Sequence, residues 1–132
     1  MEQEYIKGDI VMYDNKIHTI MDTLGVNNYE LSCVKHPVHQ LELSGVPITP
    51  EILEKNGWKR NGGQYSFTFK PYVGDNVELI GFFIEMFKNV HDMLKHRYFQ
   101  ITHENKVICG CFYVHEIQHL FFGLGLNSEM EV

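Results

Sequence analysis

Apolar and polar residues alternate along most of the first third of the chain. Residues 17–21 (IHTIM) and 29–34 (YELSCV) follow the two-residue period that places every second side chain on one face of a strand. Residues 5–13 and 39–43 also favour strands, and the short segments between the four are rich in Asp, Asn and Gly, as turns are. We therefore expect four short strands that curl into a small barrel or an antiparallel sheet.

A short helix and a hairpin are predicted next. Thr49 suits the N-cap of a helix, Pro50 suits its first position, and Asn56-Gly57 is a typical C-terminal stop. Beyond it, the Asn61-Gly62 turn signal precedes residues 64–70 (QYSFTFK), which alternate as a strand does.

The region from residue 75 to residue 96 allows two interpretations. Residues 75–78 (DNVE) have the form of a capping box, and apolar positions then recur every three or four residues, which favours a helix of about five turns. The run Phe82-Phe83-Ile84 is β-prone, so a strand over residues 77–84 is the alternative. We favour the helix, and a second copy of the chain could pair with it to form a homo-oligomer.

Two further strands are predicted over residues 98–102 and 106–112, and a final helix over residues 113–124. This helix contains His115-Glu116-x-x-His119, the pattern in which zinc peptidases use two His as ligands and the Glu as general base. At about 100° per residue, its apolar side chains lie on one side and both His lie opposite them. We therefore expect the helix to organise the C-terminal core and to turn His115 and His119 toward solvent.

A catalytic zinc also needs a third protein ligand. Residues 129 and 131 lie in an acidic tail, and no H-x-x-G-x-x-H extension follows His119. His91, His96 or His103 would be an unusual upstream choice. The pattern therefore favours a non-enzyme without cofactor, and a minimal zinc metallopeptidase is the alternative.

Composition limits the partners. A net charge of −6 disfavours non-specific binding to nucleic acid, and no leader or long apolar run indicates secretion or a membrane. Three cysteines, Cys33, Cys109 and Cys111, predict no disulfide framework and fit a cytoplasmic protein. Cys109-Gly-Cys111 is expected to be two small buried residues on one face of a strand rather than half of a metal site.

Three blocks of the sequence together resemble a known family. They are residues 5–13 with 16–20, residues 46–58 (VPITPEILEKNGW), and residues 113–124 (YVHEIQHLFFGL). The order and spacing are similar to those of small uncharacterised proteins from Bacteroides-type gut bacteria and their phages. That family has Gln and Asn where this chain has Glu116 and His119, so the zinc pattern looks like a local variation. The resemblance implies a mobile-element setting, an SH3-like N-terminal part and a C-terminal α+β part.

The sequence therefore predicts an α+β protein with an SH3-like β unit at residues 1–45 and an α+β unit of hairpins and two to three helices at residues 46–132, or one continuous domain. The expected function is a binding or interaction module of a phage or mobile element that acts on a host protein or a small nucleotide ligand. Aromatic side chains are the candidate ligand-binding residues: Trp58, Tyr65, Phe67 and Phe82.

Overall fold

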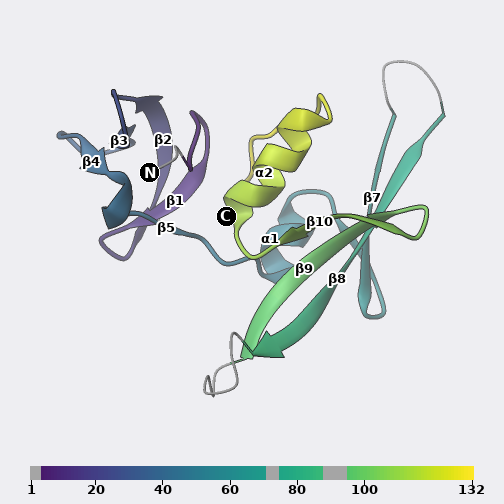
Figure 1. The fold of residues 1–132 in the computed structure, drawn as a ribbon. Coiled ribbons are helices and arrows are strands. Elements are labelled where there is room, and N and C mark those ends of the chain that lie inside the picture. Colours follow the sequence, from purple (N-terminus) through teal and green to yellow (C-terminus); the bar gives the residue numbers. More distant parts are fainter. Residues whose placement is uncertain (1–3, 71–74, 88–94) are drawn as a thin grey trace. The chain divides into compact units, whose positions relative to one another are not determined.

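A computed structural model describes residues 4–70, 75–87 and 95–132 (Figure 1). It confirms the α+β class, with two α-helices and a curled half-barrel sheet. The chain forms two compact units: unit 1 is Met1–Pro47 with Tyr113–Met130, and unit 2 is Ile48–Phe112 with Glu131–Val132. None of the described helices combines the length and the apolar character needed to span a membrane.

Unit 1 contains a five-stranded antiparallel sheet in the order β4-β3-β2-β1-β5. Its strands are β1 Ile10–Tyr13, β2 Lys16–Thr23, β3 Asn28–Leu31, β4 Val38–His39 and β5 Ser44–Gly45. Asp14 and Asn15 connect β1 to β2 with positive φ angles of 50° and 61°, which Asp and Asn tolerate better than most residues. Of the strands expected over residues 5–13 and 17–21, β1 and β2 therefore form a hairpin, with Tyr13 opposite Lys16.

The strand predicted over residues 39–43 is wrong beyond His39. Gln40–Glu42 form a 3₁₀ helix, η1, instead. His39 Nδ1 accepts the Leu41 N–H at 3.1 Å, and the Glu42 carboxylate accepts the His39 N–H at 3.0 Å. This local capping box satisfies the backbone without a strand partner, so alternation alone was a misleading signal here.

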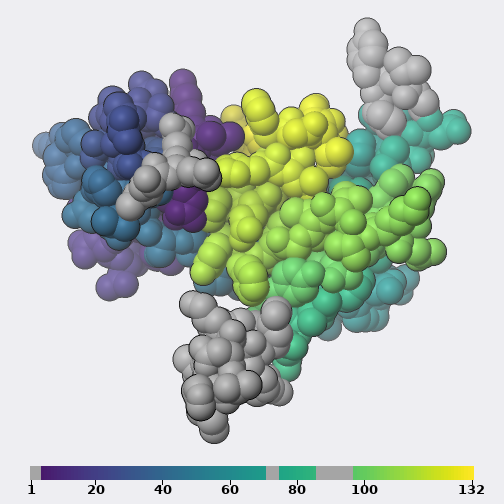
Figure 2. Space-filling view, viewed as in Figure 1, coloured from purple at the N-terminus to yellow at the C-terminus, as the bar shows by residue number. Residues whose placement is uncertain are grey.

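One apolar cluster forms the centre of the sheet in unit 1. Its buried members come from strands β1 to β4 and from the segment before β1: Tyr5, Val11, Ile20, Tyr29, Leu31 and Val38. The Tyr29 hydroxyl donates to Gln40 Oε1 at 2.7 Å, so the polar end of this buried ring is satisfied. The purple and blue atoms of these strands gather into one body in Figure 2.

Unit 2 is a meander of five antiparallel strands in the order β10-β9-β8-β7-β6, joined to one short helix. Its elements are α1 Pro50–Lys55, β6 Lys59–Asn61, β7 Gln64–Phe69, β8 Val77–Phe87, β9 Lys95–His103 and β10 Lys106–Cys111. The Thr49 hydroxyl accepts the Ile52 N–H at 3.2 Å, and Pro50 occupies the first helical position, as predicted. The predicted hairpin around Asn61-Gly62 is confirmed as β6–β7.

The helix predicted over residues 77–96 is wrong, because Val77–Phe87 form strand β8. Figure 1 shows β8 and β9 as the two long strands of unit 2, paired from Ile80↔Thr102 to Phe87↔Lys95. The run is apolar on both faces of the sheet. A continuous apolar run also has apolar residues at the three- and four-residue spacing of a helix, so the period did not distinguish the two structures. The predicted helix also covers His91 and Leu94, which lie outside the described residues.

Candidate functional site

The stretch with the zinc-peptidase pattern forms helix α2, Val114–Gly123, as predicted. Glu116 Oε1 accepts the Tyr113 N–H at 3.0 Å and so caps the start of the helix. The helix lies beside β1 in unit 1 (Figure 1), so the expectation that it organises the C-terminal core is wrong. Three of its side-chain contacts reach residues 8–10, more than a hundred positions earlier in the chain.

His115 is buried rather than solvated, with 4% of its surface exposed. Its ring stacks on Tyr113, with centroids 5.8 Å apart and planes 9° apart, and meets the Tyr5 ring edge-on at 4.9 Å. The buried face of α2 is rotated toward Gln118 relative to the apolar stripe, which leaves Leu124 40% exposed. The prediction that both His face solvent is therefore wrong for His115.

Gln118 fixes this rotation. Its side chain is 2% exposed and makes three hydrogen bonds to backbone groups. Oε1 accepts the Ile10 N–H at 2.9 Å, and Nε2 donates to the Gly8 carbonyl at 2.9 Å and to the Ser128 carbonyl at 3.0 Å. A buried amide with three satisfied bonds holds a helix in one register, because any other rotation leaves backbone groups unpaired.

His119 forms a hydrogen bond with a buried carboxylate. Its Nε2 atom lies 2.6 Å from Oδ2 of Asp9, whose surface is 2% exposed. The same oxygen accepts the Ile6 N–H at 2.9 Å. The hydrogen bond to Asp9 raises the pKa of His119, whereas burial lowers the pKa of His115. Burial also raises the pKa of Tyr5 to about 12.

This arrangement does not fit a catalytic zinc. His119 Nε2 already bonds Asp9, the Glu116 carboxylate caps the helix, and His115 Nδ1 is buried without a hydrogen-bond partner. Among residues 4–70, 75–87 and 95–132, no group of three or more His, Cys, Asp or Glu side chains is arranged to hold a metal ion. The cluster can bind and release protons, and it ties α2 to the start of β1.

Sequence reasoning missed Asp9 and the role of Gln118. Residues 5–13 are expected only to favour a strand, and nothing in the local pattern indicates that Asp9 meets a helix at residues 114–123. The block at residues 113–124 that carries the family resemblance contains both His115 and Gln118, and it is the one signal in the sequence that draws attention to them.

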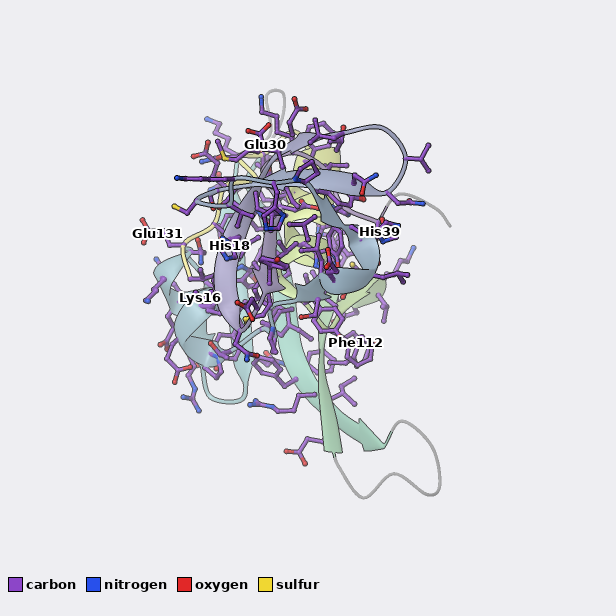
Figure 3. All side chains as sticks on the ribbon, turned by 90° about the vertical axis from the view of Figure 1, so that its left-hand side faces the viewer. Lys16, His18, Glu30, His39, Phe112 and Glu131 are labelled. Atoms are coloured by element: carbon purple, nitrogen blue, oxygen red, sulfur yellow. The ribbon has the colours of Figure 1, made fainter. Side chains whose placement is uncertain are left out.

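Other histidines of unit 1 serve local structure. His18, on β2, has its Nδ1 atom 2.7 Å from the Ser32 carbonyl, and His39 caps η1 (Figure 3). In unit 2, His103 Nδ1 lies 3.3 Å from the Glu78 carbonyl. The side chain of His96 lies outside the described part of the chain.

A second candidate site is a cleft of about 620 Å³ in unit 2. It lies over the sheet face that carries Ile80, Phe82, Gln100 and Thr102, four side chains on the two central strands β8 and β9. The turn between β9 and β10 and the neighbouring strands supply the rest of the wall: Gln64, Asn76, Glu78, His103, Glu104, Asn105 and Val107. The cleft thus combines an apolar floor with amide, hydroxyl and carboxylate groups.

The four candidate rings separate into two groups. Trp58 and Tyr65 are core residues, 2% and 3% exposed, and Phe67 packs on Trp58 with centroids 5.4 Å apart. Phe82 is the member of the set that lines the cleft. The pairing of β7 with β8 explains why only Phe82 reaches the cleft. Tyr65 and Phe67 lie opposite Gly81 and Leu79, which point to the other face of β8 from Phe82.

Comparison of the chain with protein-family models, with curated proteins and with solved structures finds no match. Function therefore has to be inferred from the geometry of the α2 cluster and of the cleft.

Proposed function

We propose that the protein is a non-enzymatic binding module and that its ligand occupies the cleft of unit 2. One observation carries the proposal: the cleft has a volume of about 620 Å³, within the range of about 300–1,000 Å³ that ligand sites occupy. Its floor offers an aromatic ring, Phe82, and an aliphatic side chain, Ile80, while Gln100 and Thr102 add hydrogen-bonding groups beside them. Such a combination gives both affinity and orientation.

The charge of the cleft selects the class of ligand. Glu78 and Glu104 are exposed carboxylates, and no Lys or Arg occurs among the described residues that line the cleft. A nucleotide phosphate would be repelled there, whereas a Lys or Arg side chain of a partner protein would gain two opposite charges and the face of Phe82. Of the two ligands considered from the sequence, a host protein with a basic segment is therefore favoured over a small nucleotide.

The wider setting is also a proposal. The family resemblance supports a phage or mobile-element protein, and the five short antiparallel strands of unit 1 support an SH3-like module. The three cysteines, which form no disulfide, support a cytoplasmic location. The acidic net charge supports partners other than bulk nucleic acid.

The proposal can be tested by NMR titration of labelled protein with short peptides that pair Lys or Arg with an aromatic residue, and with mononucleotides. We expect the peptides to shift amide signals of Ile80, Phe82, Gln100 and Thr102, and the nucleotides to leave them unchanged. Glu78→Gln should weaken peptide binding about two- to fivefold, as expected for one exposed charge. The matched control Glu54→Gln, on the exposed side of α1, should have no effect. Nucleotide binding, or peptide shifts confined to unit 1, would contradict the proposal.

The zinc-peptidase alternative has its own test. Protein purified without a His tag is analysed for metal and melted with and without a chelator. Stoichiometric zinc that disappears in a His119→Asn variant would overturn the non-enzymatic proposal. We expect unchanged melting on chelation, because His119 Nε2 is already bonded to Asp9 and the Glu116 carboxylate already caps the helix.

A further inference from the structure

Cys109 and Cys111 form a pair of thiols in contact. The two residues point to the same face of β10, opposite Ile101 and Phe99 of β9, as the sequence predicted. Their Sγ atoms lie 3.2 Å apart. Cys111 is fully buried and Cys109 is partly exposed, so one thiol of the pair is accessible to a reagent and the other is protected behind it.

The fold imposes this geometry. A Cβ atom added to Gly110 would lie 2.0 Å from Cε2 of the Tyr98 ring, so only glycine fits between the two cysteines. The Tyr98 ring is held by its hydroxyl, which donates to Gln100 Oε1 at 2.8 Å, and by Phe112, whose ring centroid lies 5.6 Å away. The β9–β10 register also shifts between Val107 and Cys109, immediately before the pair. The strand pairing therefore places both sulfurs on one face of β10, while the Tyr98 contact holds the backbone between them from the opposite face.

We propose that Cys109 and Cys111 form a reversible intrastrand disulfide by exchange with a low-molecular-weight disulfide of the glutathione class. The Cys109 thiolate attacks one sulfur of the reagent and expels one thiolate, which leaves a mixed disulfide on Cys109. The Cys111 thiolate then attacks Cys109 Sγ and expels the second thiolate. The two protons lost by the protein end on the two released thiols, so the dithiol is oxidised and the reagent is reduced to two thiols.

The distances allow this step and make it reversible. Closing the gap from 3.2 Å to a disulfide bond of about 2.04 Å requires each sulfur to move about 0.6 Å. Alternate residues of a strand have Cα atoms about 6.6–6.8 Å apart, at the upper end of the range that a disulfide spans. A bond formed at that limit is reduced more readily than a structural disulfide, although the 3.2 Å separation of the thiols still favours its formation relative to the unfolded chain.

The test uses the folded protein with Cys33→Ser, which removes the one other thiol. The reduced protein is incubated in buffers of oxidised and reduced glutathione and analysed by intact mass and peptide mapping. We expect loss of the mass of two hydrogen atoms, a disulfide within the peptide that holds both cysteines, and reversal by reduced glutathione. Persistent glutathione adducts, or two thiols that stay reduced in excess oxidised glutathione, would overturn the proposal.

Two comparisons test whether the fold, rather than chance oxidation of nearby thiols, accounts for the disulfide. Cys111→Ser should accumulate the mixed disulfide on Cys109, whereas Cys109→Ser should leave Cys111 unreacted, because Cys111 is buried. The oxidation equilibrium constant should be at least about tenfold larger in the folded protein than in the urea-unfolded protein, because only the fold holds the thiols together. An equal or smaller constant in the folded state would show that β10 does not build the site.

Discussion

Replacing Gln118 by leucine tests how α2 is fixed to the sheet of unit 1. The substitution keeps the approximate volume of the side chain and removes every polar atom. The Ile10 N–H loses its acceptor inside the protein, because Ile10 is 4% exposed and water cannot easily replace Gln118 Oε1. An orphaned buried N–H costs about 1–3 kcal/mol.

Loss of the other two hydrogen bonds of Gln118 costs less free energy. The carbonyls of Gly8 and Ser128 are only partly buried and can turn to water, so each loses a net of about 0.5–1.5 kcal/mol. The buried leucine returns about 1 kcal/mol of apolar transfer free energy. Central values give a net loss of about 3 kcal/mol from the free energy of unfolding of unit 1, a large part of the stability of a small domain.

The assay is amide hydrogen exchange of Ile10 combined with denaturant unfolding. The only tryptophan, Trp58, belongs to unit 2, so its fluorescence reports a unit that Gln118→Leu should leave unchanged. Gln64→Leu, an exposed position on β7, is the matched control and should be near neutral. If Gln118→Leu costs less than about 1 kcal/mol and Ile10 stays protected, the amide is satisfied in another way and the reasoning fails.

Three further outcomes are expected. In His115→Phe, unit 1 should be most stable below the unfolded-state His pKa of about 6.5 and should lose stability as pH rises through the raised pKa of His119, because only the folded state favours the protonated ring. In His119→Gln, the pH dependence has the opposite sign: unit 1 should lose stability as pH falls below about 6.5, because the pKa of His115 is lowered in the folded state and the unfolded state therefore takes up the proton first. Melting temperatures measured against pH test both variants. If the two variants show the same pH dependence, the reasoning is refuted. Gly81→Ala should destabilise unit 2 by about 1–3 kcal/mol, because the added Cβ would lie 2.1 Å from Cζ of Phe99, whereas Gly63→Ala, with open space around it, should be near neutral in the same urea titration.

Local chemistry made part of the fold predictable. Thr49 and Pro50 defined the start of α1 because capping involves only residues three or four positions apart. Asn61-Gly62 defined the β6–β7 hairpin for the same reason. β8 was predicted only as the alternative to a helix, because its residues are apolar on both faces and a continuous apolar run contains both a two-residue and a helical period. Gly81 belongs to this run and has a packing role, under the Phe99 ring, that only the pairing of β8 with β9 reveals.

The α2 cluster was predictable as a helix but not as a site. The apolar stripe suggested that His115 faces solvent, yet Gln118 rotates the helix by bonding backbone groups of residues 8 and 10. Asp9 meets His119 across 110 positions, and no periodicity carries information over that distance. The cleft was predictable only through Phe82, since its remaining walls depend on which strands pair.

Unit 1 is built from two separate segments of the chain, Met1–Pro47 and Tyr113–Met130, and this sets an order of events during synthesis. The sheet strands end at Gly45 and α2 begins at Val114, so all of the chain between them must be made before the helix can join. At about 5–20 residues per second, these roughly 70 residues take on the order of 4–14 s. During that interval the Ile10 N–H lacks Gln118 and the Asp9 carboxylate lacks His119. The strands of unit 2, whose contacts are local in sequence, can already pair as they are made. The nascent sheet is thus the part of the molecule that stays incomplete longest, until residue 114 and the helix after it have been made.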